Sequence, residues 1–117
     1  MALYIFTVKY TAESWATQIH DQGNVLERLE PAVASLKGTI NGCYYAVGVY
    51  DLVLLAEFPG DEEASAMSLI TKAGGSLESI TRTRLMSVEQ GLSAMRLAAQ
   101  VAPSYHPPVT HKMTHAD

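Results

Sequence analysis

The stretch at residues 44–64, YYAVGVYDLVLLAEFPGDEEA, decides the fold because it contains a strand that is apolar on both of its faces. Successive side chains of a strand point to opposite faces of the sheet, so a strand with one exposed face alternates apolar and polar residues. Residues 52–56, LVLLA, are apolar at every position. We therefore predict a strand over residues 52–58 that is covered on both faces in the native protein.

The remaining chain predicts three further strands and three helices. Runs rich in aromatic and β-branched residues predict strands at residues 3–10, 39–47 and 76–86. Thr11 can cap a turn at residues 12–15. Helical spacing of Leu26, Leu29, Val33 and Leu36 predicts a first helix, which follows residues 23–24 and ends at residue 38. Pro31 lies inside this helix, so we expect a kink near residues 27–30 or a restart at the proline.

Two later helices have clearer boundaries. In the second, Asp61 is a good N-cap and two consecutive glycines at residues 74–75 favour a helix end. The third opens with a sequence typical of a capping box, at residues 87–90. The expected buried stripe of the second helix is Ala66, Leu69, Ile70 and Ala73. In the third helix, helical spacing is kept by Val88, Leu92, Met95 and Ala99.

The order β-α-β-β-α-β followed by a helix is the split βαβ arrangement of α+β ferredoxin-like domains, which carry a four-stranded antiparallel sheet with helices on one face. We expect this domain at residues 1–90, the rest of the C-terminal helix at 91–100, and a flexible Pro- and His-containing tail at 101–117. The doubly apolar strand requires a cover for the open face. A second subunit related by two-fold symmetry is one candidate, and the third helix folding over a monomer is the alternative.

Composition excludes several classes of protein. A chain of 117 residues that is 48% hydrophobic predicts one compact domain. The net charge of -4, with no basic cluster, argues against a nucleic-acid partner. Cys43 is the single cysteine, which excludes an internal disulfide and indicates a reducing cytoplasm. With neither an export signal nor an apolar run of roughly 18 residues, we expect a cytoplasmic protein without membrane association.

Short motifs in every element resemble the GYD-domain family. They are residues 3–5 with Tyr10 and Thr11, Gly48-x-Tyr50-Asp51, the acidic helix start at 61–64, and Thr81-x-Thr83-x-Leu85. The resemblance covers residues 3–90. It implies the dimeric α/β-barrel arrangement, in which two ferredoxin-like subunits join their sheets, and a family that largely lacks an assigned activity.

The Gly48–Asp51 corner has two interpretations. Structurally, Gly48 permits a turn, Asp51 accepts hydrogen bonds from turn N–H groups, and Tyr50 covers the barrel end. Functionally, Tyr50 and Asp51 form the polar rim of a ligand cavity, with Asp51 as a proton acceptor. The tetrapeptide is compatible with both.

Further candidate pocket residues lie near the end of the first strand. Tyr10, Trp15 and His20 surround a possible barrel mouth, although a histidine there is commonly a surface residue. Tyr44 and Tyr45 are consecutive, so they must face opposite sides of the sheet. Cys43 shares a face with Tyr45 and is expected to be a buried thiol.

Charged side chains suggest weaker sites. Arg82 and Arg84 share a strand face, where they could bind a carboxylate ligand, pair with Glu57 or Glu78, or lie exposed. The tail contains His106, His111 and His115, which we interpret as part of a flexible segment and not as a metal site.

Two classes of function follow. The first is a small homodimeric binding or association module that uses the open sheet face and takes a small-molecule ligand, with neither metal nor cofactor predicted. The alternative is a small dimeric-barrel enzyme, a cofactor-independent or haem-dependent monooxygenase or isomerase acting on a small apolar or aromatic substrate. The latter rests on analogy between folds.

Overall fold

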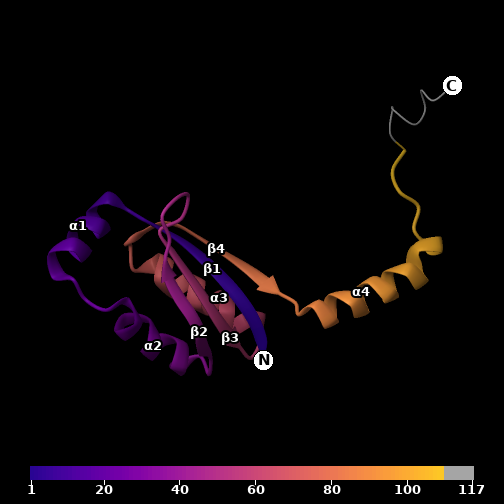
Figure 1. Ribbon diagram of the computed structural model, residues 1–117, viewed down its shortest axis with the longest axis horizontal. Helices are drawn as coiled ribbons and strands as arrows, with labels where there is room; N and C mark the ends of the chain where they lie inside the picture. The colour runs from indigo at the N-terminus through magenta and orange to yellow at the C-terminus, as the bar shows by residue number, and fades with distance from the viewer. Residues whose placement is uncertain (110–117) are drawn as a thin grey trace. The chain divides into compact units, whose positions relative to one another are not determined.

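A computed structural model describes residues 1–109 and contains a four-stranded sheet and four α-helices in that range (Figure 1). The chain divides into two compact units, residues 1–85 and a second unit from Met86 onward. The elements of the first unit are β1 (Ala2–Tyr10), α1 (Ala12–Asp21), α2 (Val25–Ser35), β2 (Thr39–Tyr45), β3 (Leu52–Phe58), α3 (Asp61–Ala73) and β4 (Leu77–Leu85). The second unit contains α4 (Val88–Val101) and a short 3-10 helix (Ala102–Ser104).

The sheet has the strand order β2-β3-β1-β4, with every neighbouring pair antiparallel. Ile5 at the centre of β1 is paired with Leu55 of β3 on one side and with Thr83 of β4 on the other. The predicted α+β ferredoxin-like fold is therefore confirmed, and the sheet remains open, because β2 and β4 form its two edges.

The core lies on the face of the sheet that carries the helices. Alternate residues of β1 and β3 point to this face and are buried: Tyr4, Phe6, Val8, Tyr10, Leu52, Leu54, Ala56 and Phe58. Val33 of α2 and Ala64 and Met67 of α3 complete the main cluster. Phe6 and Phe58 pack edge to face with their ring centroids 6.0 Å apart, a geometry that aromatic pairs favour.

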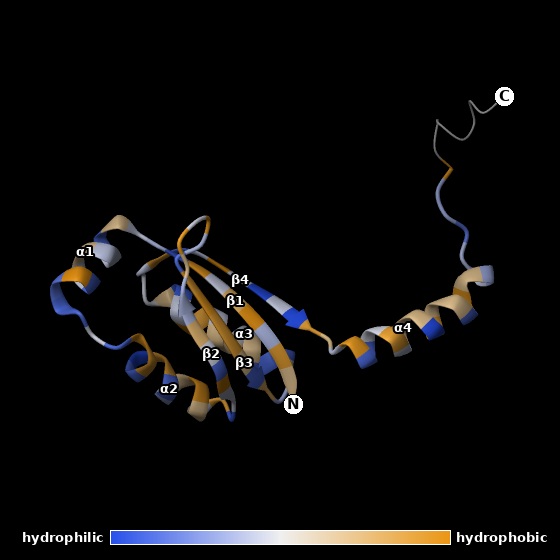
Figure 2. Cartoon of the chain, viewed as in Figure 1, coloured by the Kyte–Doolittle hydropathy of each residue, from blue (hydrophilic) through white to orange (hydrophobic). Residues whose placement is uncertain are grey.

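The opposite face, which we call the open face, is formed by the intervening residues of the strands. Its half-buried members are Leu3, Ile5, Thr7, Gly42, Val53, Leu55, Glu57 and Leu85. Figure 2 shows that β3 is hydrophobic along most of its length. Leu54 points toward the helices and Leu55 toward the open face, so the two apolar surfaces predicted for this strand are both present.

The first helical region differs from the prediction. Residues 12–21 form the complete helix α1 where a short turn was expected. Thr11 does cap it, since its Oγ1 accepts a hydrogen bond from the Ser14 backbone N–H at 3.0 Å. The helix has no buried residue, so no apolar stripe marked it in the sequence.

Pro31 was expected to cause either a kink or a restart of the helix. The restart is excluded, because helix α2 continues through this proline. Leu29 and Val33, on either side of it, both pack against the core and keep the two turns in one helix. Tertiary packing can offset the lost backbone hydrogen bond in this way.

Helix α3 was placed correctly, but its buried face was predicted wrongly. Ala64 and Met67 are buried, whereas Leu69 is 67% exposed and Ile70 is 50% exposed. Gly60 is the N-cap, and Asp61 is the first residue of the helix. The expected left-handed residue at the C-terminal end is Gly75, with φ of 79°.

Helix α4 begins with the predicted capping box. Ser87 Oγ accepts a hydrogen bond from the Gln90 N–H, and Gln90 Oε1 accepts one from the Ser87 N–H, both at 3.0 Å.

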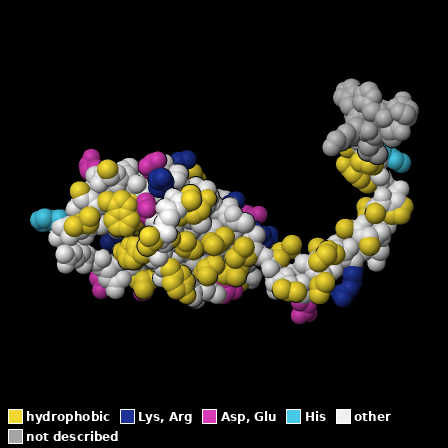
Figure 3. Space-filling model, turned by 45° about the horizontal axis from the view of Figure 1, so that its top comes forward, with side chains coloured by type: hydrophobic (Ala, Val, Ile, Leu, Met, Phe, Trp, Pro, Cys, Tyr) yellow, Lys and Arg dark blue, Asp and Glu magenta, His cyan; other side chains and the backbone are white. Residues whose placement is uncertain are grey.

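The expected tail start at residue 101 was too early, because α4 includes Val101 and a 3-10 turn follows. Apolar side chains of α4 are exposed within this unit (Figure 3). His111 and His115 lie outside the described residues.

Candidate functional site

A cavity of about 850 Å³ lies on the helix-bearing side of the sheet. It forms because α2 packs on the edge strand β2 while α3 packs mainly on the other edge strand, β4. The central strands β1 and β3 therefore face the space between the helices. The apolar residues that line the cavity are Phe6, Val8, Val25, Leu29, Leu52, Leu54, Met67, Ile70, Leu77 and Ile80.

Polar side chains from α1, α2 and their connection line another part of the cavity. Arg28 is the only lysine or arginine among the lining residues. Its Nη2 donates a hydrogen bond to Oε1 of Gln18 at 3.2 Å, which links α2 to α1. The acidic lining residues Glu13, Asp21 and Glu27 are all exposed. The cavity thus combines a large apolar wall with one guanidinium group.

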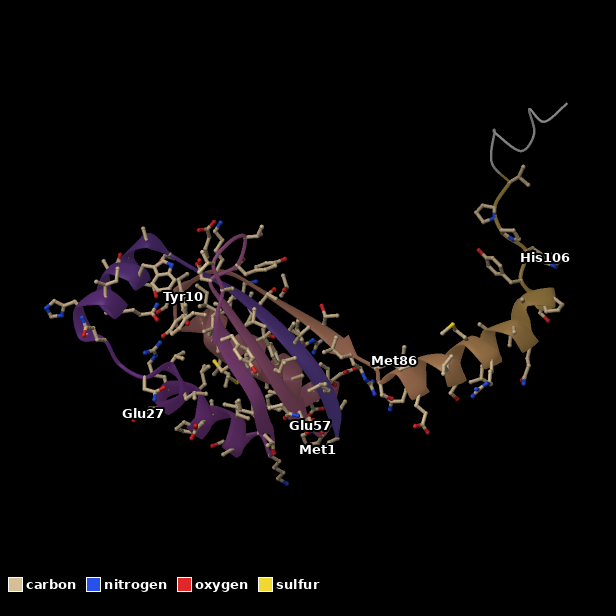
Figure 4. All side chains as sticks on the ribbon, in the orientation of Figure 1. Met1, Tyr10, Glu27, Glu57, Met86 and His106 are labelled. Atoms are coloured by element: carbon tan, nitrogen blue, oxygen red, sulfur yellow. The ribbon has the colours of Figure 1, made fainter. Side chains whose placement is uncertain are left out.

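Tyr10 lies at the end of β1 and joins the apolar and polar parts of the cavity (Figure 4). The ring is buried and packs edge to face with Trp15, the centroids being 5.3 Å apart. Trp15 in turn lies 6.3 Å from the ring of Tyr45. Burial raises the pKa of the Tyr10 phenol above its ordinary value, and the nearby Arg28 guanidinium acts in the opposite direction. A phenol is protonated at neutral pH, so Tyr10 can act as a hydrogen-bond donor there.

Asp51 is held at the same end of the sheet. Its Oδ2 accepts a hydrogen bond from the Tyr10 backbone N–H at 2.8 Å. Its own N–H donates to the Val8 carbonyl at 2.8 Å, and its carbonyl accepts from the Ala46 N–H at 2.9 Å. The carboxylate thus accepts one hydrogen bond, which comes from the end of β1 and not from the turn itself.

The rest of the Gly48–Asp51 corner is more exposed. Gly48 has φ of 154°, which side-chain-bearing residues rarely adopt, so a glycine is required for this turn. Tyr50 is 38% exposed and is not among the residues that line the cavity.

Two other predicted pocket residues lie away from this group. His20 is exposed on α1, where its Nδ1 lies 2.9 Å from Oδ1 of Asp21. Tyr44 is paired with Val53 and lies on the open face, whereas Tyr45 lies on the helix side. The structure thus brings together Tyr10, Trp15, Tyr45 and Asp51.

Sequence reasoning missed Arg28 and Gln18. Both belong to the polar faces of helices, and the helix that carries Gln18 was not predicted, so no spacing rule related the two residues. Their hydrogen bond joins residues ten positions apart across a helix break. The only sign of this site in the sequence was a single arginine, Arg28, beside the apolar stripe predicted for the first helix.

The side chains of Arg82, Arg84 and Cys43 contact other residues of the fold. Arg82 donates to Ser65 Oγ at 2.5 Å and to the Asp61 carbonyl at 3.1 Å, and Arg84 lies 4.0 Å from the Asp61 carboxylate. Both arginines are exposed, and neither pairs with Glu57 or Glu78. Cys43 was expected to be buried but is half-buried at the edge of the core, and this burial raises the pKa of its thiol.

Residues 1–109 offer neither a metal-ion cluster nor a membrane-spanning helix. No group of three or more histidine, cysteine, aspartate or glutamate side chains there is arranged to hold a metal ion. None of the helices in that range combines the length and hydrophobicity that a membrane span needs.

Comparison with known families and structures gives one family and several similar folds. The GYD domain family model matches residues 4–95. No curated protein sequence matched the chain.

Three solved structures show how far the fold of this chain resembles known folds. The 5-chloro-2-hydroxyhydroquinone dehydrochlorinase of Burkholderia phenoliruptrix AC1100, solved with 2,5-dihydroxybenzoquinone, is 19% identical, with a TM-score of 0.54 over 75% of this chain and 97% of that one. MtbAldR is 12% identical, with a TM-score of 0.57 over 74% of this chain. The match spans 52% of MtbAldR, about half of its length. TTHA0845 of Thermus thermophilus is 17% identical, with a TM-score of 0.50 over 75% of this chain and 96% of that one. At these identities the likeness concerns the fold.

Proposed function

The chain belongs to the GYD domain family, and from this premise we propose that it is a small homodimeric association module whose subunits meet through the open face of the sheet. The observation that carries the proposal is the pair of apolar surfaces on β3. Leu52 and Leu54 are buried under the helices, while Val53 and Leu55 stand on the opposite side. An apolar sheet face of this kind favours burial against another surface.

The composition of the open face supports close packing. Ile5, Val53 and Leu55 form its centre, through the pairs Ile5–Leu55 and Thr7–Val53. The hydroxyl groups of Thr7 and Thr81 hydrogen-bond to each other, so both side chains can be buried without losing a partner. Among the charged residues of β1 and β3, Lys9 and Glu57 stand at opposite ends of the face. Its centre can therefore be desolvated at low cost.

A charge at the centre of the open face tests the proposal. Leu55→Glu should convert a dimer into a monomer, because an unpaired carboxylate buried in the interface costs about 3–5 kcal/mol. Leu69→Glu is the matched control, since Leu69 is an exposed residue of α3 on the other side of the sheet. Sedimentation velocity at micromolar concentration measures the outcome. A wild-type protein that sediments as a monomer, or a Leu55→Glu variant that remains dimeric, would contradict the proposal.

A second candidate function is a small dimeric-barrel enzyme for an apolar or aromatic substrate. The helix-side cavity and its buried phenol, Tyr10, favour it. His20 is the only histidine of residues 1–85 and does not line the cavity, which argues against a histidine-ligated haem there. We expect native mass spectrometry to reveal a co-purifying small molecule if this candidate is correct, and no Soret absorption band. A Soret band in the purified protein would favour the haem-dependent form instead.

A further inference from the structure

We propose that the helix-side cavity binds an amphipathic organic acid, with the apolar body against the sheet and a single carboxylate at Arg28 and Tyr10. The cavity belongs to one protomer and lies within residues 1–85. The proposal therefore depends neither on association through the open face nor on catalysis.

The size and lining of the cavity indicate the body of the ligand. A volume of about 850 Å³ falls in the range of sites that hold drug-sized molecules. Phe6, Leu52 and Leu54 are nearly fully buried beneath the lining, so the carbon surface that a ligand can contact comes from apolar lining residues that keep exposed area: Leu29, Ile70, Leu77 and Ile80. A compact apolar group, such as a phenyl ring with a short alkyl chain, matches this wall.

The surroundings of Arg28 indicate that the head group of the ligand is a carboxylate. Its hydrogen bond goes to the neutral amide of Gln18, although Glu13, Asp21 and Glu27 line the same cavity. Within residues 1–109, no carboxylate approaches the Arg28 guanidinium to 4.0 Å. The guanidinium thus keeps donors for a ligand, and its planar fork matches a carboxylate through two parallel hydrogen bonds.

Tyr10 supplies a second donor near the head group. A phenol is protonated at neutral pH, and burial raises the Tyr10 pKa further, while the charge of the nearby Arg28 lowers it. The edge-to-face contact with Trp15 and the Asp51 hydrogen bond to the Tyr10 backbone fix the position of this residue. A ligand carboxylate at Arg28 can therefore accept a hydrogen bond from a donor that is already in place.

The charges around the cavity restrict the ligand to a single negative charge. One guanidinium stands among three acidic lining residues. A polyanion such as a nucleoside diphosphate would have one cation to neutralise it and three carboxylates to repel it. A monocarboxylate needs only the charge that Arg28 carries.

The proposal can be tested with 4-phenylbutanoate and its uncharged analogue 4-phenylbutanamide. Titration calorimetry of the wild-type protein should show tighter binding of the acid than of the amide. Arg28→Gln should weaken binding of the acid by about 10-fold or more, the typical effect of losing a charge-assisted hydrogen bond, and leave binding of the amide unchanged. Arg96→Gln in α4 is the matched control and should bind both compounds like the wild type.

A second pair of variants tests the location of the site. Ile70 lines the cavity, whereas its neighbour Leu69 is exposed and does not. Ile70→Trp should obstruct the cavity and weaken binding of both compounds, while Leu69→Trp should not. Absence of binding in the wild type, equal affinity for acid and amide, or equal effects of the two variants in either pair would overturn the proposal.

Discussion

A single carboxylate, that of Asp51, organises one end of the sheet. It accepts the hydrogen bond of the Tyr10 N–H, and the Asp51 backbone bonds to Val8 and Ala46. One residue thus ties the start of β3 to the ends of β1 and β2. These contacts support the structural interpretation of the Gly48–Asp51 corner, and they also fix the position of Tyr10 at the cavity.

Substitution of Asp51 separates a structural role from a charge-dependent one. Asp51→Ala should lower the free energy of unfolding by about 1 kcal/mol or more, because the Tyr10 N–H loses its acceptor. Asp51→Asn keeps an acceptor oxygen and should retain most of the stability. Thermal unfolding of both variants measures the difference. If instead Asn abolishes ligand binding as completely as Ala while stability is kept, the carboxylate charge itself is functional.

A second residue contact predicts a pH dependence. The Tyr4 hydroxyl donates a hydrogen bond to Oδ1 of Asp61 at 2.5 Å, and this bond, followed by the charges of Arg84 and Arg82, lowers the Asp61 pKa against the opposing effect of burial. A carboxyl whose pKa is lower in the folded state stabilises the fold above its unfolded pKa, and that contribution is lost as the pH falls through the folded pKa.

Tyr4→Phe should therefore lower Tm most at neutral pH, and the difference from wild type should shrink in acid, below the ordinary carboxyl range. The measurement is Tm as a function of pH for the wild type and the variant. Tyr105→Phe, at an exposed position, provides the control and should show no such pattern. A Tyr4→Phe deficit that stays constant with pH would show that the carboxylate contributes nothing through this bond.

At the scale of the element, β3 contains two adjacent leucines with different roles. Leu54 is 3% exposed beneath the helices, and Leu55 is half-buried on the open face. The same substitution at the two positions should therefore have different consequences, one for the folded protomer and one for association.

Leu54→Ala should lower the free energy of unfolding by about 2–5 kcal/mol at any protein concentration, because it leaves a cavity in the core. The proposed dimer would make stability depend on protein concentration by mass action, and Leu55→Ala should mainly reduce that dependence. Urea unfolding at two widely separated concentrations distinguishes these effects. Concentration-independent losses of equal size at both positions would show that the open face is not used for association.

At the scale of the whole molecule, the chain consists of two compact units, and the family match extends from the first into α4. Val88, Leu92 and Met95 of α4 are exposed within the second unit. The residues after α4 that the structure describes are exposed as well. The core of residues 1–85 is complete without any of them.

Deletion of residues 103–117 should consequently leave both folding and association unchanged. The reason is that, within residues 1–109, no member of the two buried clusters lies beyond Ile80. Tm and sedimentation of the truncated and full chains provide the comparison. A truncated chain that fails to fold, or that sediments differently, would assign the segment a role in the core or between subunits.

The sequence alone determined the features that depend on neighbouring residues. The bounds of β3 were predicted correctly, and the capping box of Ser87 and Gln90 was identified from residues three positions apart. Alternation along β4 correctly placed Arg82 and Arg84 on the same face of the strand. These features are local, because strand periodicity and helix capping involve residues close in sequence.

Only the tertiary structure decided how the helices meet the sheet. It selected Ala64 and Met67 over Leu69 and Ile70 as the buried residues of α3, since several faces of this helix are apolar enough to pack. It also formed the hydrogen bond between Tyr10 and Asp51, which are 41 positions apart. The cavity exists because α2 and α3 cover opposite edges of the sheet, a spacing set by packing between distant segments and not by any local pattern.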